Sequence, residues 1–301
     1  MRLFIPHLLL LLLAPPLLLG VINRTKSWFS GRRGPPVLQL YRDIGRLMKK
    51  SLTLSRTTTW LFPAGPVVAL VAPLLAGFLL PFGPLAPVGF QGDAILFAYL
   101  FALARFFTMT AALDTGSAFE GMGASREATL ACFTEPILFF SFLALARISG
   151  SLRLGEMLGG SLSSAWSLRG PALMLLAAGL FALLLAENCR IPFDDPNTHL
   201  ELTMIHEVMV LDHSGPFYAL VLYGSAVKLF VLSSLLVRLV APVNTGSIGV
   251  DAFLLLIGTL FLAVLVGIVE SVVARLKMNK VPNLLLAATA LCAFGFLLQL
   301  R

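Results

Sequence analysis

Long apolar runs alternate with short polar segments along the whole chain. Each run is about as long as a helix must be to cross the hydrocarbon core of a bilayer. The short alternating segments typical of a membrane barrel are not seen. The runs predict eight membrane-spanning helices near residues 3–22, 60–81, 94–113, 128–147, 170–187, 216–240, 252–273 and 281–300. We therefore predict an all-α, polytopic protein with a single integral membrane domain over residues 1–301.

The first apolar run follows Met1 and Arg2 and could be read as a signal peptide. Its apolar character continues to Ile22, and no small-residue cleavage motif follows it. A signal peptide usually has a shorter apolar region and such a motif. We therefore expect an uncleaved first helix.

One polar segment carries a helical pattern of its own. Between residues 37 and 48, the apolar residues recur at helical spacing, and charged residues fall between them. This pattern predicts an amphipathic helix that lies along the cytoplasmic surface. Such a helix could bind anionic lipid or dock a partner protein, and the sequence leaves both roles open.

Composition supports a membrane location, and the charges set an orientation. Hydrophobic residues make up 58% of the 301 positions and charged residues only 12%, well below the share in a soluble domain. Lys and Arg concentrate in the loops after the first and seventh predicted spans. By the positive-inside rule, both termini should lie outside the inner (cytoplasmic) membrane. The loops expected on the cytoplasmic side are about 23–58, 114–127, 188–215 and 274–280. The net charge of +7 mostly reflects this asymmetry, so it gives no reason to expect nucleic-acid binding.

Metal and redox motifs are not apparent in the sequence. The three cysteines are far apart and form no C-x-x-C pair; they are Cys132, Cys189 and Cys292. His199 and His206 would lie about 10 Å apart on one helix, too far to share a metal ion. No nucleophile elbow or ordered catalytic triad is apparent. We expect the chain to bind no metal or cofactor itself.

The segment 187–215 is the most polar part of an otherwise apolar chain. It holds six acids, three histidines and one arginine between two apolar runs. Asp195 followed by proline predicts a helix start, and Glu201 would then project from the apolar face of that helix. An acid partly removed from water can change protonation near neutral pH, as a proton relay requires. The alternative is that Glu201 simply pairs with a buried base such as Arg105 or Lys228.

Further ionisable residues lie in or beside the third to seventh predicted spans. Intramembrane charge is costly and usually functional, so these residues suggest a connected polar path through the bundle. The alternative is a set of salt bridges that only pack helices together. The residues expected on a proton path are Arg105, Asp114, Glu120, Glu127, Glu135, Glu187, Glu201, Glu207, Lys228 and Glu270.

The polar segment also carries a family resemblance. From Ala186 it reads A-E-N-C-R-I-P-F-D-D-P-N-T-H-L-E-L. This sequence resembles the membrane subunit of group 4 membrane-bound nickel–iron hydrogenases, of the formate hydrogenlyase and hydrogenase-4 type. These subunits belong to the wider family of subunit 1 of respiratory complex I. Three further segments fit the resemblance, which covers essentially the whole chain: Gly31 to Pro35, Ser125 to Glu127, and Arg275 to Pro282.

The resemblance implies a membrane anchor for a soluble arm. That arm would contain the hydrogenase large and small subunits and iron–sulfur proteins, and would supply the nickel–iron and iron–sulfur centres. The subunit would also contact lipid and antiporter-like membrane subunits, and would link redox chemistry to movement of protons or sodium ions. The residues expected at the junction with the arm are Arg32, Arg33, Arg190, Asp194, Asp195, His206 and Asp212.

Two other functions remain open. The corresponding subunit of a complex I-type dehydrogenase would bind quinone, but the residues after Gly34-Pro35 depart from the complex I pattern and follow the hydrogenase-like form. A stand-alone ion transporter is disfavoured because no internal repeat is visible and the cytoplasmic loops resemble docking segments.

Overall fold

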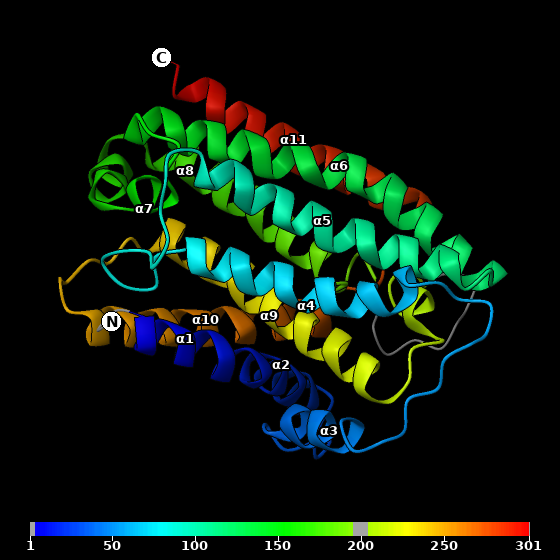
Figure 1. Cartoon of the computed structure of the whole chain (residues 1–301). Helices are drawn as coiled ribbons and strands as arrows, with labels where there is room; N and C mark the ends of the chain where they lie inside the picture. The colour runs from blue at the N-terminus through cyan, green and yellow to red at the C-terminus, as the bar shows by residue number, and fades with distance from the viewer. Residues whose placement is uncertain (1–3, 195–203, 301) are drawn as a thin grey trace.

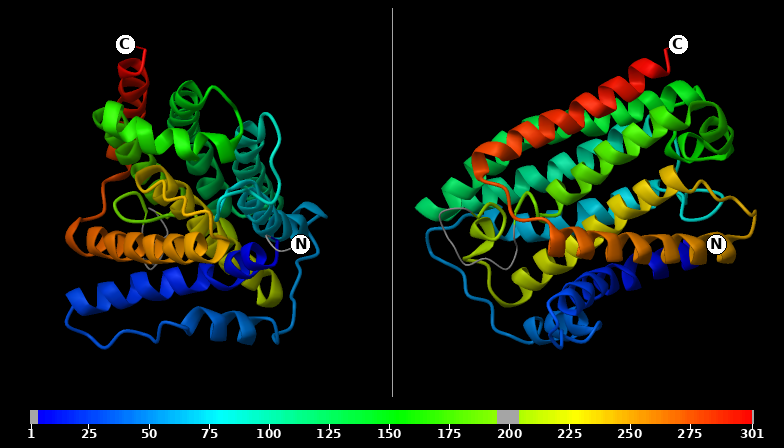
Figure 2. Two further views of the ribbon diagram at one scale, coloured as in Figure 1. Left: turned by 90° about the vertical axis from the view of Figure 1, so that its left-hand side faces the viewer. Right: turned by 180° about the vertical axis from the view of Figure 1, so that it is seen from behind.

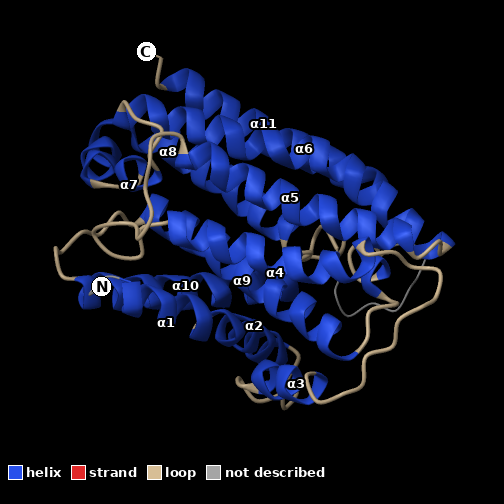
Figure 3. Cartoon of the chain, viewed as in Figure 1, coloured by secondary structure: helices blue, strands red, loops and turns tan. Residues whose placement is uncertain are grey.

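The computed structural model describes residues 4–194 and 204–300, and the residues described contain helices but no strand (Figures 1 and 3). Eight helical segments in it are long and apolar enough to cross a membrane, as predicted. The α-helices are α1 (Phe4–Leu13), α2 (Pro15–Phe29), α3 (Gln39–Leu47), α4 (Leu61–Leu79), α5 (Asp93–Asp114), α6 (Ala118–Ser149), α7 (Leu154–Met157), α8 (Gly160–Glu187), α9 (Gly215–Val240), α10 (Ile248–Val272) and α11 (Val281–Leu298). Two short 3₁₀ helices, η1 (Val208–Val210) and η2 (Met278–Lys280), complete the described elements.

The first span is made of two helices, because Pro15 and Pro16 interrupt it. A proline has no backbone N–H, so the carbonyls of the preceding turn lose their helical partners. Two tyrosine hydroxyls replace those donors. Tyr223 of α9 donates to the Leu12 carbonyl at 2.7 Å, and Tyr41 of α3 donates to that of Leu13. The break therefore attaches the first span to both α9 and α3.

The predicted amphipathic helix is present as α3, which packs beside α2 and α9. Its approach depends on Gly20 of α2. A Cβ at this position would lie 1.9 Å from the carbonyl oxygen of Val37, just before α3. Only glycine permits so close an approach, so the first loop folds back against the bundle.

The spanning helices run roughly side by side in a tilted bundle (Figure 2). The neighbours include α4 with α5 and α9, α8 with α11, α6 with α11, and α2 with α10. The loop that joins α3 to α4 lies at one end (Figure 1). Both ends of the described chain lie at the other end, beside α7. This arrangement puts the two termini on one side of the bundle.

Two of the predicted helices begin about ten residues earlier in the structure than in the prediction. We expected the fourth span to begin near residue 128, but α6 begins at Ala118. Its first turns bury Glu120, Gly123 and Glu127 at helical spacing, although their polarity ends the apolar run. Similarly, α8 begins at Gly160 instead of near 170, with a kink at Arg169 just before a proline.

The helix predicted to begin at Asp195 falls mostly outside the described residues, as does Glu201. The described part, from Met204, forms turns and η1 and no α-helix, so the prediction is wrong for residues 204–211. The predicted apolar face is nevertheless buried, as Met204, Ile205 and Val208 show. Turns and a short 3₁₀ helix therefore bury the same apolar side chains that an α-helix would have buried.

Candidate functional site

The inward face of α6 positions the first acid of the site. Glu120, Gly123, Ala124 and Glu127 are all buried and follow one another at helical spacing. A Cβ on Gly123 would lie 2.9 Å from the carbonyl oxygen of Ile205. The small residue therefore allows the segment after residue 204 to pack directly on α6, next to Glu127.

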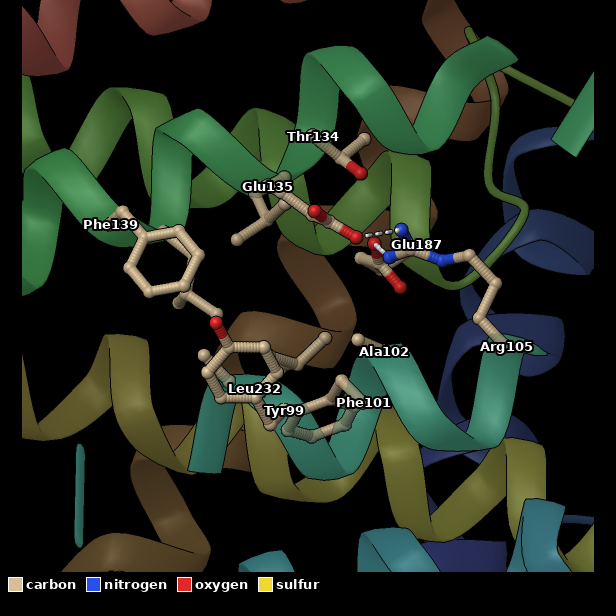
Figure 4. A pocket seen from close by; sticks show the side chains of 12 residues that line it. Tyr99, Phe101, Ala102, Arg105, Thr134, Glu135, Phe139, Glu187 and Leu232 are labelled. Atoms are coloured by element: carbon tan, nitrogen blue, oxygen red, sulfur yellow. Dashed lines mark hydrogen bonds and ion pairs between the residues drawn. The ribbon is translucent and has the colours of Figure 1, made fainter. Parts of the chain in front are cut away.

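Arg105 of α5 contacts three acids from two other helices, two of which, Glu135 and Glu187, appear in Figure 4. Its Nε lies 3.3 Å from Oε1 of Glu127, and its Nη1 lies 3.2 Å from Oε1 of Glu135. Its Nη2 bonds to Oε1 of Glu187 at the end of α8. Arginine suits this position because its planar guanidinium presents several donors in fixed directions and stays charged.

A second base extends the cluster. Nζ of Lys228, on α9, lies 2.8 Å from Oε2 of Glu187. Glu187 is thus held between bases on α5 and α9, and its own side chain is buried. Charges removed from water are stable only when they are paired in this way. The alternative interpretation of the sequence named Arg105 and Lys228 as possible partners of Glu201, which lies outside the described residues; among those described, the acid that joins the two bases is Glu187.

The segment from Met204 to Ser214 closes the cluster on one side. His206 Nε2 lies 3.4 Å from Glu127 Oε2. The Asp194 carboxylate holds this segment in place by accepting hydrogen bonds from the backbone N–H groups of Ile205 and His206. Arg275, after α10, in turn contacts Asp194 at 2.7 Å. A loop-borne imidazole is thereby fixed against a buried acid.

Glu270 forms the centre of a second ion-pair group. Its side chain is fully buried and contacts Lys26 of α2 at 2.8 Å and Arg190 at 3.3 Å. Arg190 belongs to the loop after α8, so this group joins the first span, α10 and that loop. It lies next to the first cluster, because Arg190 lines the same cavity as Arg105.

A cavity of about 210 Å³ connects the two groups. Its volume could hold about seven waters at the density of the liquid. Most of the wall area is apolar, and the ionisable residues on the wall are Arg105, Glu127, Glu187, Cys189, Arg190, Asp194, His206, Glu207, Tyr218 and Lys228. Acids, a histidine and space for water are the components of a proton-transfer route. The cavity therefore brings together side chains of the kinds that such a route requires.

Cys189 is the one thiol on this wall. Burial, and secondarily the Asp194 carboxylate, raise the pKa of Cys189 well above its ordinary value, so the thiol is neutral. Among the described residues, the His, Cys, Asp and Glu side chains form no group of three or more that could hold a metal ion.

Three other residues were expected on the proton path. Two of them, Asp114 and Glu120, do not line the cavity, whereas Glu207 does. Asp114 accepts hydrogen bonds from the backbone and side chain of Thr59, at the start of α4. Glu120 is buried and accepts the backbone N–H of Asp212 at 3.1 Å, so it anchors the loop. Glu207 lines the cavity.

The residues expected at the junction with the arm separate into two sets. Arg32, Arg33 and Asp212 are exposed. Arg190, Asp194 and His206 instead line the cavity and bind buried partners. Asp195 and Glu201 lie outside the described residues, so their positions remain predictions.

Lys26 and Arg275 belong to the site, but their sequence context did not predict this. Lys26 stands four residues after Ile22, the end of the predicted span, and α2 in fact continues to Phe29. Had the predicted first helix been extended by one turn, it would have included Lys26. No sequence signal links Arg275 to Asp194, because the two lie far apart in the chain.

Comparisons with known proteins agree with this architecture. The sequence model of a family described as NADH dehydrogenase matches residues 2–300. Hydrogenase-4 component C of Escherichia coli K12 is 34% identical over 273 residues, which cover 88% of this chain and 85% of that protein. Formate hydrogenlyase subunit 4 of the same strain is 31% identical over 295 residues, covering 96% and 93%. A chain in the structure of the membrane-bound sulfane sulfur reductase, an archaeal respiratory membrane complex, has the same fold, with a TM-score of 0.85, 20% identity, and coverage of 99% and 100%.

Proposed function

This chain belongs to the NADH dehydrogenase family, which includes subunit 1 of complex I, and we propose that it couples the redox chemistry of a hydrogenase-type complex to ion movement. In this proposal it anchors a soluble arm to the membrane and contains a path for protons or, alternatively, sodium ions. Nickel–iron and iron–sulfur centres would be held by the hydrogenase large and small subunits and iron–sulfur proteins of that arm. Antiporter-like membrane subunits and lipid would surround the chain in the inner membrane, with both termini outside.

One observation carries the coupling role: a cavity whose walls bring together Glu127, Glu187 and the loop residue His206. Side chains that only packed helices together would not need space for water between them. Here His206 contacts Glu127, and Arg105 contacts both Glu127 and Glu187. The cavity therefore supports proton transfer over simple ion pairing.

The bases and acids of this cluster have different parts in the proposed path. Arg105 stays protonated at any physiological pH, so it can pair with the carboxylates around it but cannot relay protons. The carboxyl of Glu127 and the imidazole of His206 are groups of the kind that transfer protons, whereas Glu187 is held between Arg105 and Lys228. A movement of the loop would change the distance between His206 and Glu127, and with it the contact through which a proton could pass. Docking of the arm on this loop would then control protonation inside the bundle.

The test is Glu127→Gln in the purified complex, reconstituted into vesicles. Glutamine keeps the shape and polarity of the side chain but cannot carry a proton, and positioned proton carriers contribute about 100-fold or more to transfer rates. With reduced methyl viologen as electron donor, protons moved per hydrogen formed should fall at least about tenfold. Glu156→Gln provides the matched control, because Glu156 is an exposed residue paired with Arg153 at i,i+3. Normal proton movement by the Glu127→Gln complex would end the proposal.

Quinone binding is a second candidate, favoured by the largely apolar wall of the same cavity. A photoreactive quinone added to the complex distinguishes the two functions. Labelling of a peptide that lines the cavity would support the quinone function. Labelling confined to lipid-facing positions would support the first proposal alone.

A further inference from the structure

Glu135 is the one exposed acid among the described residues of the eight spanning segments. It lies near the middle of α6, and its side chain is 49% exposed, whereas that of Glu187 is only 7% exposed. A carboxylate that faces lipid within a spanning segment is costly. Something other than acyl chains should cover this side chain.

The surface around Glu135 differs from an ordinary lipid-facing surface. Tyr99 of α5 and Phe139 of α6 stand beside Glu135 (Figure 4), with their ring centroids 6.3 Å apart. Tyr99 is 61% exposed, and Cys132 is exposed one turn before Glu135 on α6. A pocket of about 40 Å³ lies among Tyr99, Glu135 and Phe139 and reaches Arg105. We call Tyr99, Cys132, Glu135 and Phe139 the Glu135 surface.

The charges behind this surface indicate what covers it. The ion-pair cluster contains three acids against two bases, namely Glu127, Glu135 and Glu187 against Arg105 and Lys228. His206 adds positive charge only when it is protonated. Glu135 is the half-exposed acid of this cluster, and the one that a neighbouring chain can reach. A basic side chain from outside would balance it.

We propose that the Glu135 surface docks a membrane-spanning helix of a partner subunit, which presents a basic side chain to Glu135. This inference rests on the proposed function, since it specifies where a membrane partner joins the ion path. Glu135 contacts Arg105, and Arg105 contacts Glu127 and Glu187, so the docked base would be linked electrostatically to the cavity. The partner could thereby sense the protonation of the cluster.

Photocrosslinking in intact membranes tests the proposal without any redox assay. Benzoylphenylalanine is placed at Phe139, which is 41% exposed, and separately at Phe261, an exposed phenylalanine of α10 that serves as the matched probe. The Phe139 probe should crosslink to a spanning segment of a polytopic subunit of the same complex, with a Lys, Arg or His within about one helical turn of the crosslink. Crosslinks from Phe139 only to lipid, to a soluble subunit or to a second copy of this chain would each refute it.

Two variants then test the role of the surface. Glu135→Leu should reduce the Phe139 crosslink about tenfold, as expected when an intramembrane charge pair is lost. Glu135→Leu also removes one ion-pair partner of Arg105, so a second variant is needed that leaves the ion pairs intact. Cys132→Trp adds bulk at an exposed position of the same surface and should give a similar loss. Ile257→Trp, on the exposed face of α10, should leave the crosslink unchanged. An undiminished crosslink in both Glu135→Leu and Cys132→Trp would overturn the proposal.

The two proposals fail in different ways. Loss of proton coupling in Glu127→Gln with a lipid-only crosslink at Phe139 would keep the coupling role and reject the docking surface. A subunit crosslink at Phe139 with normal pumping in Glu127→Gln would keep the surface and reject the proton path.

Discussion

Burial determines what each ionisable residue of this chain can do. Glu127 and Glu187 are buried beside bases, and this pairing offsets the cost of removing a carboxylate from water. His213 is buried against the ring of Phe62 instead, with ring centroids 4.2 Å apart. Burial lowers the pKa of His213 to about 4 from its ordinary value of 6.5, so the folded protein holds a neutral imidazole.

His213 predicts a pH dependence of stability. Since its folded pKa is below its unfolded pKa, the unfolded chain binds the extra proton as the pH falls. Stability is therefore retained above pH 6.5 and is lost progressively between pH 6.5 and about 4. Lowering the pH from about 7.5 to about 5.5 should reduce the contribution of His213 to the unfolding free energy by about 1.4 kcal/mol.

Unfolding of the purified chain in detergent at the two pH values measures this loss. His213→Phe keeps an aromatic contact with Phe62 but cannot be protonated, so it should show about 1.4 kcal/mol less pH sensitivity than the parent chain. Equal sensitivity in the two proteins would show that His213 is not the group responsible.

At the scale of elements, the first span and α3 form one connected unit. The proline break frees carbonyls that Tyr41 and Tyr223 satisfy, and Gly20 lets the chain at Val37 approach α2. Lys26, in the last turns of α2, binds the buried Glu270. The first loop, which the family resemblance assigns to docking, is thus attached to the side chains around the cavity.

Gly20→Ala should detach this loop. Its Cβ would overlap the Val37 carbonyl, a backbone atom that cannot move aside as a flexible side chain can. Overpacking of this kind typically costs about 1–3 kcal/mol, so tryptic cleavage within α3 should become about tenfold faster or more. Digestion of the purified chain, followed by mass spectrometry, measures the rate.

Gly45→Ala is the matched control within α3. A Cβ at Gly45 would meet no atom within 4 Å, and alanine favours the helix by up to about 1 kcal/mol. Cleavage of this variant should be unchanged or slower. If Gly20→Ala were cleaved no faster than Gly45→Ala, the close contact at Val37 would not hold the loop in place.

At the scale of the molecule, the two ends of the bundle differ in character. The loop with Arg32 and Arg33 follows α2, so it lies at the opposite end of the first span from Phe4. Arg32 and Arg33 are exposed, so they are available to a partner. This end also lies nearest the segment that positions His206 against Glu127. An arm docked here would contact the loops that close the cavity.

Arg32→Ala combined with Arg33→Ala should loosen the soluble arm. Exposed arginines attract an acidic surface over several ångströms, and the attraction weakens as salt rises. The amount of arm that co-purifies with this chain should fall about tenfold at low salt, with a smaller difference at high salt. Arg147→Ala with Arg169→Ala, two exposed arginines near α7, provides the control. Equal recovery of the arm from both double variants would contradict the docking role of Arg32 and Arg33.

The sequence by itself determined the eight spans, the amphipathic helix and the family. Each depends on local properties, namely the length of an apolar run, the spacing of apolar residues within one helix, and a contiguous motif around Arg190. It also identified most of the ionisable residues of the site, since charge inside an apolar run stands out. It misplaced the starts of α6 and α8 because both helices extend into polar residues.

Only the tertiary structure decided which charges meet and which face outward. Glu127 and Glu135 lie on the same helix, and both contact Arg105, yet one is buried and the other half-exposed. The direction in which a residue points within a bundle depends on the rotation of its helix and on its neighbours, which are set by the packing of distant segments. The contacts of Asp194 with Arg275 and of Glu270 with Lys26 join segments about 80 and over 240 residues apart, so no local pattern could reveal them.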